Sequence, residues 1–171
     1  MQDKRVVTSK GNPLTLSGNP VKTGEPAPDF EVVANDLSIV RFSSFREKVC
    51  LIASVPSLDT SVCDNETKKF NEKAAAFSNN VAVLIISMDL PFAQKRWCSA
   101  SGVENLQTLS DHRKADFGLK FGVLIEELRL LARAVFVVDA KGIIRYIQIV
   151  DETGKEPDYE KAIEALKGVL Q

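Results

Sequence analysis

The octapeptide Pro56-Ser-Leu-Asp-Thr-Ser-Val-Cys63 follows an apolar run typical of a buried strand and puts a cysteine where a helix is expected to begin. Unpaired backbone N–H groups and the positive end of the helix dipole favour an anion in the first turn of a helix. Cys63 is therefore expected to act as a thiolate nucleophile. The hydroxyl of Thr60 is expected to cap the helix, to orient a substrate oxygen or to bond the sulfur, and one residue can do all three.

A second cysteine, Cys98, lies near the end of a helix expected over residues 91–101, where the dipole disfavours a thiolate. If one of the two is the primary nucleophile, electrostatics therefore select Cys63. Cys98 is the better candidate for closing a disulfide with an oxidised Cys63, because Cys50 lies inside an apolar run and is expected to be buried. The alternative is that these cysteines are ordinary small core residues.

The segment Thr60-Ser-Val-Cys63 resembles a Cys-x-x-Cys redox site whose first cysteine is replaced. Thioredoxin-type dithiol exchange is therefore excluded within this loop, and the resolving thiol must come from elsewhere. A disulfide needs Cα atoms within about 7 Å of each other. Because both cysteines are expected on helices, we hypothesise that the second helix frays around Trp97 and Cys98 after oxidation.

Two continuous apolar runs, at residues 49–55 and 81–88, predict the strands that position Cys63. Such runs are typical of strands buried on both faces of a sheet that helices cover. With the helix between them they form a right-handed parallel unit. The apolar stripe expected on that helix consists of Val62, Phe70, Ala74 and Phe77.

The other expected elements surround this unit. They are an N-terminal hairpin (6–8 and 14–17), two short strands (30–33 and 39–42), a helix from Pro91 to about Ser101 stopped by Gly102, a hairpin (134–139 and 143–149) and a last helix that starts at Asp158 and carries Ile163, Leu166 and Leu170. This order predicts an α/β fold with a central mixed β-sheet flanked by helices. We expect one domain over residues 1–171, with residues 1–20 as a hairpin extension.

Composition excludes several classes of protein. The 22 basic and 23 acidic residues nearly cancel, so a nucleic-acid partner is not expected. The N-terminus lacks the apolar stretch of a signal peptide, and the longest apolar run, 81–86, is too short to span a bilayer, so we expect a soluble, cytoplasmic protein. Three cysteines and a single histidine, His112, fit neither a secreted disulfide framework nor a metal site, and no cofactor is expected.

The pattern Pro56-x-x-x-Thr60-x-x-Cys63 resembles the signature of the peroxiredoxins. The longer strings at residues 56–71 and 87–98 resemble the bacterial thiol peroxidase branch, of the atypical two-cysteine type, and segments 131–139 and 156–159 also match. Trp97 departs from the phenylalanine that is common at its position, which affects local packing around Cys98.

The resemblance implies a thioredoxin-like fold, a homodimer, a hydroperoxide substrate and reduction by thioredoxin. It implies that Cys63 is the peroxidatic cysteine and Cys98 the resolving cysteine. It also implies that Pro56, Thr60 and Arg133 complete the active site, whereas without the resemblance a structural ion pair would be the favoured role of Arg133.

The expected reaction requires more than an ionised thiol. Lowering a thiol pKa from about 8.5 to about 6 raises the thiolate fraction roughly 30-fold, but it weakens each thiolate roughly 10-fold, so the net gain is about threefold. The larger contribution must come from stabilising charge on the departing oxygen. Arg133 is always charged and donates several hydrogen bonds, and Thr60 supplies a hydroxyl.

Two other functions use the same residues. A redox sensor would switch between Cys63 and Cys98 but turn over slowly, and a general thiol–disulfide oxidoreductase is disfavoured by the missing first cysteine. The preferred peroxide is not fixed by the sequence. Leu58, Phe92 and Trp97 would either line a pocket for alkyl hydroperoxides or belong to the core.

Overall fold

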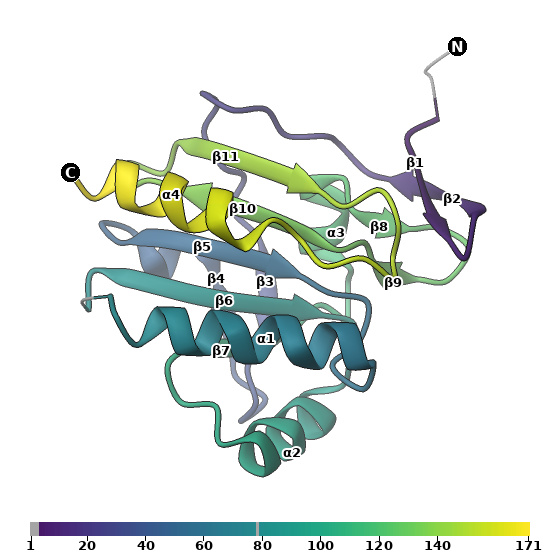
Figure 1. The fold of residues 1–171 in the computed structure, drawn as a ribbon, viewed down its shortest axis with the longest axis horizontal. Coiled ribbons are helices and arrows are strands. Elements are labelled where there is room, and N and C mark those ends of the chain that lie inside the picture. Colours follow the sequence, from purple (N-terminus) through teal and green to yellow (C-terminus); the bar gives the residue numbers. More distant parts are fainter. Residues whose placement is uncertain (1–3, 78) are drawn as a thin grey trace.

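The computed structural model describes residues 4–77 and 79–171, and its centre is a seven-stranded mixed sheet in the order β11-β10-β5-β6-β7-β3-β4 (Figure 1). A second, four-stranded sheet has the order β1-β2-β8-β9. The strands are β1 (Val6–Ser9), β2 (Asn12–Ser17), β3 (Glu31–Val33), β4 (Ile39–Arg41), β5 (Val49–Ser54), β6 (Val81–Ser87), β7 (Gln107–Ser110), β8 (Leu124–Ile125), β9 (Leu130–Leu131), β10 (Ala134–Val138) and β11 (Ile144–Ile149). The helices are η1 (Phe42–Phe45), α1 (Ser61–Ala74), α2 (Pro91–Ser101), α3 (Asp116–Phe121) and α4 (Tyr159–Val169).

The core lies on both faces of the central sheet. Alternate residues of each strand point to opposite faces, so β5 sends Leu51 to one side and Ile52 to the other. The first face is covered by α1 and α4, which contribute Phe70 and Leu166 to its core (Figure 1). The second face packs against α3 and the small sheet. Burial on both faces explains why β5 and β6 are continuous apolar runs.

The strand pairing brings two distant segments to one end of the sheet. β5 and β6 are parallel, and β10 pairs with β5 in the antiparallel direction. In that register Ala134 lies opposite Ser54. The residue just before β10, Arg133, therefore lies beside the loop that leaves the C-terminal end of β5 and leads to Cys63.

Most of the expected elements are confirmed. The N-terminal hairpin, the strands at 49–54 and 81–87 and the C-terminal hairpin occur as expected. The second helix spans Pro91–Ser101, and Gly102 ends it with a left-handed φ of 64°. Asp158 caps α4 and accepts a hydrogen bond from the backbone N–H of Lys161. The part of the expected extension at residues 1–3 lies outside the described residues.

Two expectations about helix faces were wrong in part. On α1 the predicted Phe70 and Ala74 are buried, but Val62 is only half-buried, and Phe77 packs against the same core from beyond the end of the helix. The buried face of α1 also carries Cys63, Glu66 and Thr67. At the other end of the chain, Leu170 follows the last turn of α4 and is 41% exposed, because the helix ends before it.

Five elements were not predicted: η1, β7, β8, β9 and α3. In the small sheet, β8 and β9 are each two residues long, and α3 has six residues. Segments of this length carry too little periodicity to be recognised. Across the described ranges, 4–77 and 79–171, no helix is long and apolar enough to cross a membrane.

Candidate active site

Cys63 lies in the first turn of α1, where the sequence placed it, and its side chain has no exposed surface. The N-cap position is Thr60, whose extended backbone (φ −92°, ψ 146°) lets the chain turn from the loop into the helix. The unpaired N–H groups of this turn and the helix dipole act on the sulfur. Burial gives the sulfur little contact with water, so neighbouring charges act on it strongly.

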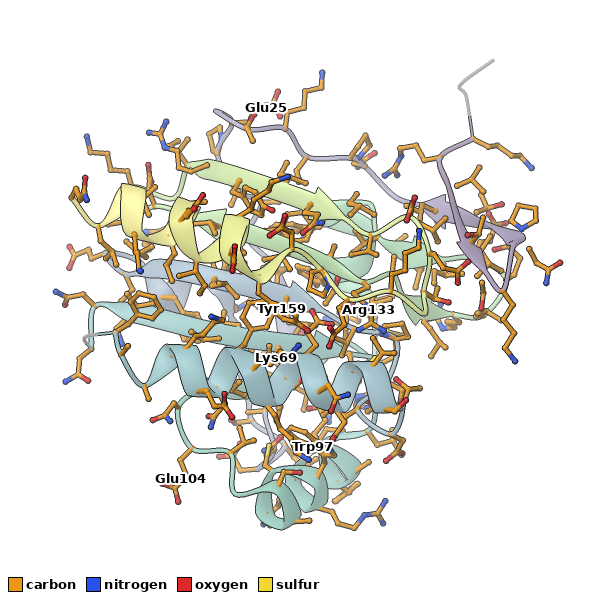
Figure 2. All side chains as sticks on the ribbon, in the orientation of Figure 1. Glu25, Lys69, Trp97, Glu104, Arg133 and Tyr159 are labelled. Atoms are coloured by element: carbon orange, nitrogen blue, oxygen red, sulfur yellow. The ribbon has the colours of Figure 1, made fainter. Side chains whose placement is uncertain are left out.

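The nearest charge to Cys63 is Arg133, which is 2% exposed. One terminal nitrogen donates to the Cys63 Sγ at 3.3 Å and to the backbone carbonyl of Thr153 at 2.9 Å. The other donates to the carboxylate of Glu66. Burial works to lower the pKa of Arg133, but the adjacent Glu66 and Cys63 raise it overall, so the cation is retained. Figure 2 shows Arg133 beside the N-terminal end of α1.

Glu66 is a site residue that sequence reasoning missed. It lies one turn after Cys63 on the same face of α1 and is fully buried. Burial raises the pKa of its carboxyl group to about 7, although the Arg133 guanidinium acts in the opposite direction. Its Oε1 has no hydrogen-bond partner among the described residues. The available signal was an acidic residue three positions after Cys63, on the face that also carries Phe70.

The raised pKa of Glu66 predicts a dependence of stability on pH. The folded protein holds this proton up to about pH 7, whereas the unfolded chain releases it near pH 4.5. Unfolding therefore releases a proton between these values, and stability falls as pH rises through them. Chemical denaturation of the native protein and Glu66→Gln should show the native protein losing stability relative to the variant as pH rises across this window. A difference that stays constant with pH would contradict this assignment.

Thr60 and Pro56 belong to the loop before α1. Pro56 is half-buried where the chain leaves β5, and Thr60 is exposed. The Thr60 hydroxyl donates to the backbone carbonyl of Ser57 at 2.9 Å, and among the described contacts it forms no helix-capping bond. Because its proton is engaged there, its oxygen is left as an acceptor for a substrate O–H group.

Asp89, a second residue that the sequence did not single out, fixes this loop. Its carboxylate accepts the Ser57 hydroxyl at 2.7 Å and the Leu58 N–H at 2.8 Å. It also accepts the Ser87 hydroxyl at the end of β6, at 2.8 Å. The loop before Cys63 is therefore bound to the turn that starts α2.

Cys98 is half-buried on α2, and both it and Cys63 are free thiols in this structure. Its sulfur lies 3.3 Å from the Thr108 hydroxyl and 4.0 Å from the side-chain nitrogen of Asn35. The structure therefore gives the two cysteines separate surroundings. Trp97 joins the two helices, since its indole N–H donates to Asp64 at 2.8 Å. Its role thus extends beyond local packing around Cys98.

The other candidates are placed as follows. Cys50 is 1% exposed, and burial raises its pKa to about 12, so it stays a thiol. His112 is half-buried, and its Nδ1 lies 2.9 Å from the Ser110 hydroxyl. Within the described part of the chain, no three His, Cys, Asp or Glu side chains are grouped so as to hold a metal ion.

The apolar residues near the site have different surroundings. Leu58 is buried and packs in the same core cluster as Cys63, against which Trp97 is partly buried. Phe92 is 66% exposed on the first turn of α2. Leu58 and Trp97 therefore pack in the core, whereas the Phe92 side chain is exposed at the surface.

Comparison with known proteins identifies close relatives. The redoxin family model matches residues 22–163. A thiol peroxidase of Halalkalibacterium halodurans is 58% identical over 96% of this chain and 98% of that protein, and one of Bacillus subtilis is 50% identical over 96% and 98%. The crystal structure of a peroxiredoxin-like protein from Aquifex aeolicus matches with a TM-score of 0.91 at 45% identity, over 96% of this chain and 97% of that one. The expected thioredoxin-like fold is confirmed by these matches.

Proposed function

This chain belongs to the redoxin family, on its thiol peroxidase branch, and from that premise we propose that it reduces hydroperoxides through a Cys63 sulfenic acid. The Cys63 thiolate attacks the terminal oxygen of the peroxide, and the O–O bond breaks. The sulfur becomes a sulfenic acid, and the departing oxygen takes up a proton and leaves as water or an alcohol.

The observation that carries this proposal is the 3.3 Å contact between the Arg133 guanidinium and the Cys63 sulfur in a buried site. A cation held there stabilises the thiolate before reaction and the negative charge on the departing oxygen during it. The Thr153 carbonyl and the Glu66 carboxylate hold the guanidinium in place before substrate arrives. The Thr60 oxygen is the second proposed contact for the peroxide.

The second step is proposed to join Cys98 to Cys63. The Cys98 thiol attacks the sulfenic sulfur, a disulfide forms and water leaves. In the described structure Cys98 faces Thr108 on β7, and Trp97 anchors α2 to α1 through Asp64. We therefore propose that the last turns of α2 unwind and that the Trp97–Asp64 hydrogen bond breaks when the disulfide forms.

Several partners follow from the same proposal. A dithiol protein of the thioredoxin type would reduce the disulfide and complete the cycle. The odd number of cysteines and this need for a reductant support a cytoplasmic location.

We also propose a homodimer, and one peroxiredoxin domain over the chain with the N-terminal hairpin as its extension. Leu90 and Phe92 are 53% and 66% exposed, and they provide apolar surface for such a contact.

The proposal predicts which cysteines are joined after oxidation. One equivalent of hydrogen peroxide should give a single disulfide between Cys63 and Cys98, mapped by mass spectrometry of proteolytic peptides. In Cys98→Ser, Cys63 should instead be trapped as a sulfenic acid by a dimedone probe. Hydrogen exchange on the same samples should be faster around Trp97 in the disulfide form. A disulfide through Cys50, or equal protection of α2 in both forms, would contradict the respective step.

A further inference from the structure

The N-terminal hairpin contacts residues 151–153, a segment whose Thr153 carbonyl accepts a hydrogen bond from Arg133, the candidate catalytic arginine. In Figure 1 the chain leaves β11, passes β1 and returns to α4. The segment at residues 151–153 forms backbone hydrogen bonds with the hairpin: Thr8 N–H donates to Asp151 at 2.7 Å, and Thr153 N–H donates to Thr8 at 2.8 Å. The hairpin thus binds residues 151–153, which belong to neither sheet, through backbone hydrogen bonds.

Glu152 is the centre of this contact. Its carboxylate accepts the Thr8 hydroxyl at 2.7 Å, the Lys10 N–H at 3.1 Å and the Gly11 N–H at 3.3 Å. Both backbone donors lie in the hairpin turn, where Lys10 and Gly11 have left-handed φ values of 48° and 80°. Donation from Thr8, followed by the backbone N–H groups, lowers the pKa of Glu152 to about 2. The carboxylate is therefore charged when it binds the turn.

Thr153 connects this contact to the active site. Its N–H is held by the hairpin through Thr8, and its carbonyl accepts the Arg133 nitrogen at 2.9 Å. That same nitrogen donates to the Cys63 sulfur at 3.3 Å. The position of the Thr153 carbonyl therefore influences how the guanidinium is oriented between Glu66 and Cys63.

We propose that Glu152 is a positioning residue of the peroxidase reaction, which fixes Thr153 against the hairpin so that its carbonyl holds Arg133 on the Cys63 sulfur. The proposal rests on the function proposed above and adds a role for the hairpin in it. Glu152 does not touch substrate, and its effect passes through Thr153. When this support is lost, the guanidinium is free to turn toward Glu66 and away from the departing oxygen.

The test compares two carboxylates that bind opposite strands of the hairpin. Glu152→Gln weakens the contact to the turn, and the matched control, Glu127→Gln, weakens the contact to β2, where Glu127 accepts the Thr15 N–H at 3.0 and 2.8 Å through its two oxygens. Each change is made in the Cys98→Ser protein. The rates of Cys63 oxidation by hydrogen peroxide and of Cys63 alkylation by iodoacetamide are then measured separately.

We expect Glu152→Gln to slow peroxide oxidation about tenfold, because a small displacement of a catalytic group is costly for the transition state. Alkylation, which has no departing peroxide oxygen, should change less than about twofold in the same protein. Glu127→Gln should leave both rates within about twofold of the parent. A loss of oxidation rate without a loss of alkylation rate, found in Glu152→Gln and not in Glu127→Gln, distinguishes an effect on the position of Arg133 from a general loosening of the hairpin.

The inference is overturned if Glu152→Gln oxidises at the parent rate, if both glutamine variants slow equally, or if oxidation and alkylation fall together. Should Glu152→Gln not fold, Thr8→Val is tested in its place, because it removes the hydroxyl that donates to Glu152 at 2.7 Å and lies 3.2 Å from the Asp151 carbonyl, and it keeps the backbone bonds of Thr8. It should slow oxidation about threefold with alkylation unchanged, and an unchanged oxidation rate would end the proposal. Failure of the proposed function itself would appear differently, as a parent protein that does not react with peroxide.

Discussion

Cys63→Ser is expected to lose peroxide consumption altogether, by about four orders of magnitude or more. A serine hydroxyl is not ionised near neutral pH, and its oxygen cannot form the sulfenic acid that the cycle requires. The surroundings of the side chain, buried and 3.3 Å from the Arg133 guanidinium, would otherwise be retained. Peroxide consumption coupled to NADPH oxidation through thioredoxin and its reductase measures the loss.

Cys50→Ser is the matched control for this substitution. Cys50 is also buried, but burial raises its pKa to about 12 and it lies inside β5 with its sulfur 3.8 Å from the Lys48 carbonyl. Its replacement should preserve peroxide reduction while lowering the melting temperature. Native-rate clearance of peroxide by Cys63→Ser would overturn the proposed mechanism as a whole.

Arg133→Lys is expected to slow peroxide reduction about 100- to 1,000-fold, even though the positive charge is kept. The planar guanidinium serves three acceptors at once: the Cys63 sulfur, the Thr153 carbonyl and the Glu66 carboxylate. A lysine ammonium is a shorter, rotating donor group and cannot reproduce this fork. The second-order rate of Cys63 oxidation by hydrogen peroxide, measured on the reduced protein, gives the effect.

The matched control is Arg145→Lys, at an exposed arginine that pairs with Asp139 at 2.7 Å. Surface pairs of this kind contribute about 0–1 kcal/mol, so this variant should keep its activity and stability. Thermal unfolding of both variants shows whether each is folded. A folded Arg133→Lys protein with near-native oxidation rates would show that the arginine has a structural role only.

The sequence anticipated parts of the site in different ways. Cys63 could be placed by local reasoning, because the start of a helix depends on residues close in the chain. Arg133 was proposed only through the family resemblance, since its contact with Cys63 spans 70 residues and depends on the pairing of β10 with β5. Glu66 was missed because its role exists only once Arg133 lies beside it.

The same distinction applies to the fold. Strands such as β5 and β6 can be predicted from their long apolar runs, because a strand buried on both faces has few polar residues. The two-residue strands β8 and β9 depend on pairing with distant or neighbouring segments, since β8 pairs with β2 of the N-terminal hairpin and β9 pairs with β8. No local pattern of that length distinguishes a strand from a turn.

Local order along the chain was enough to predict Cys63 as the nucleophile, to predict the helix that begins beside it and to show that the same loop contains no second thiol. The environment that makes the nucleophile reactive was set by folding. Arg133, Thr153 and the α1 pair Cys63 and Glu66 come from three separate segments. They meet around the Arg133 guanidinium only because the antiparallel pairing of β10 with β5 and the return of the chain past the hairpin bring them there. A helix start depends on neighbouring residues, whereas a buried charge network requires chain segments that the core has already fixed in space.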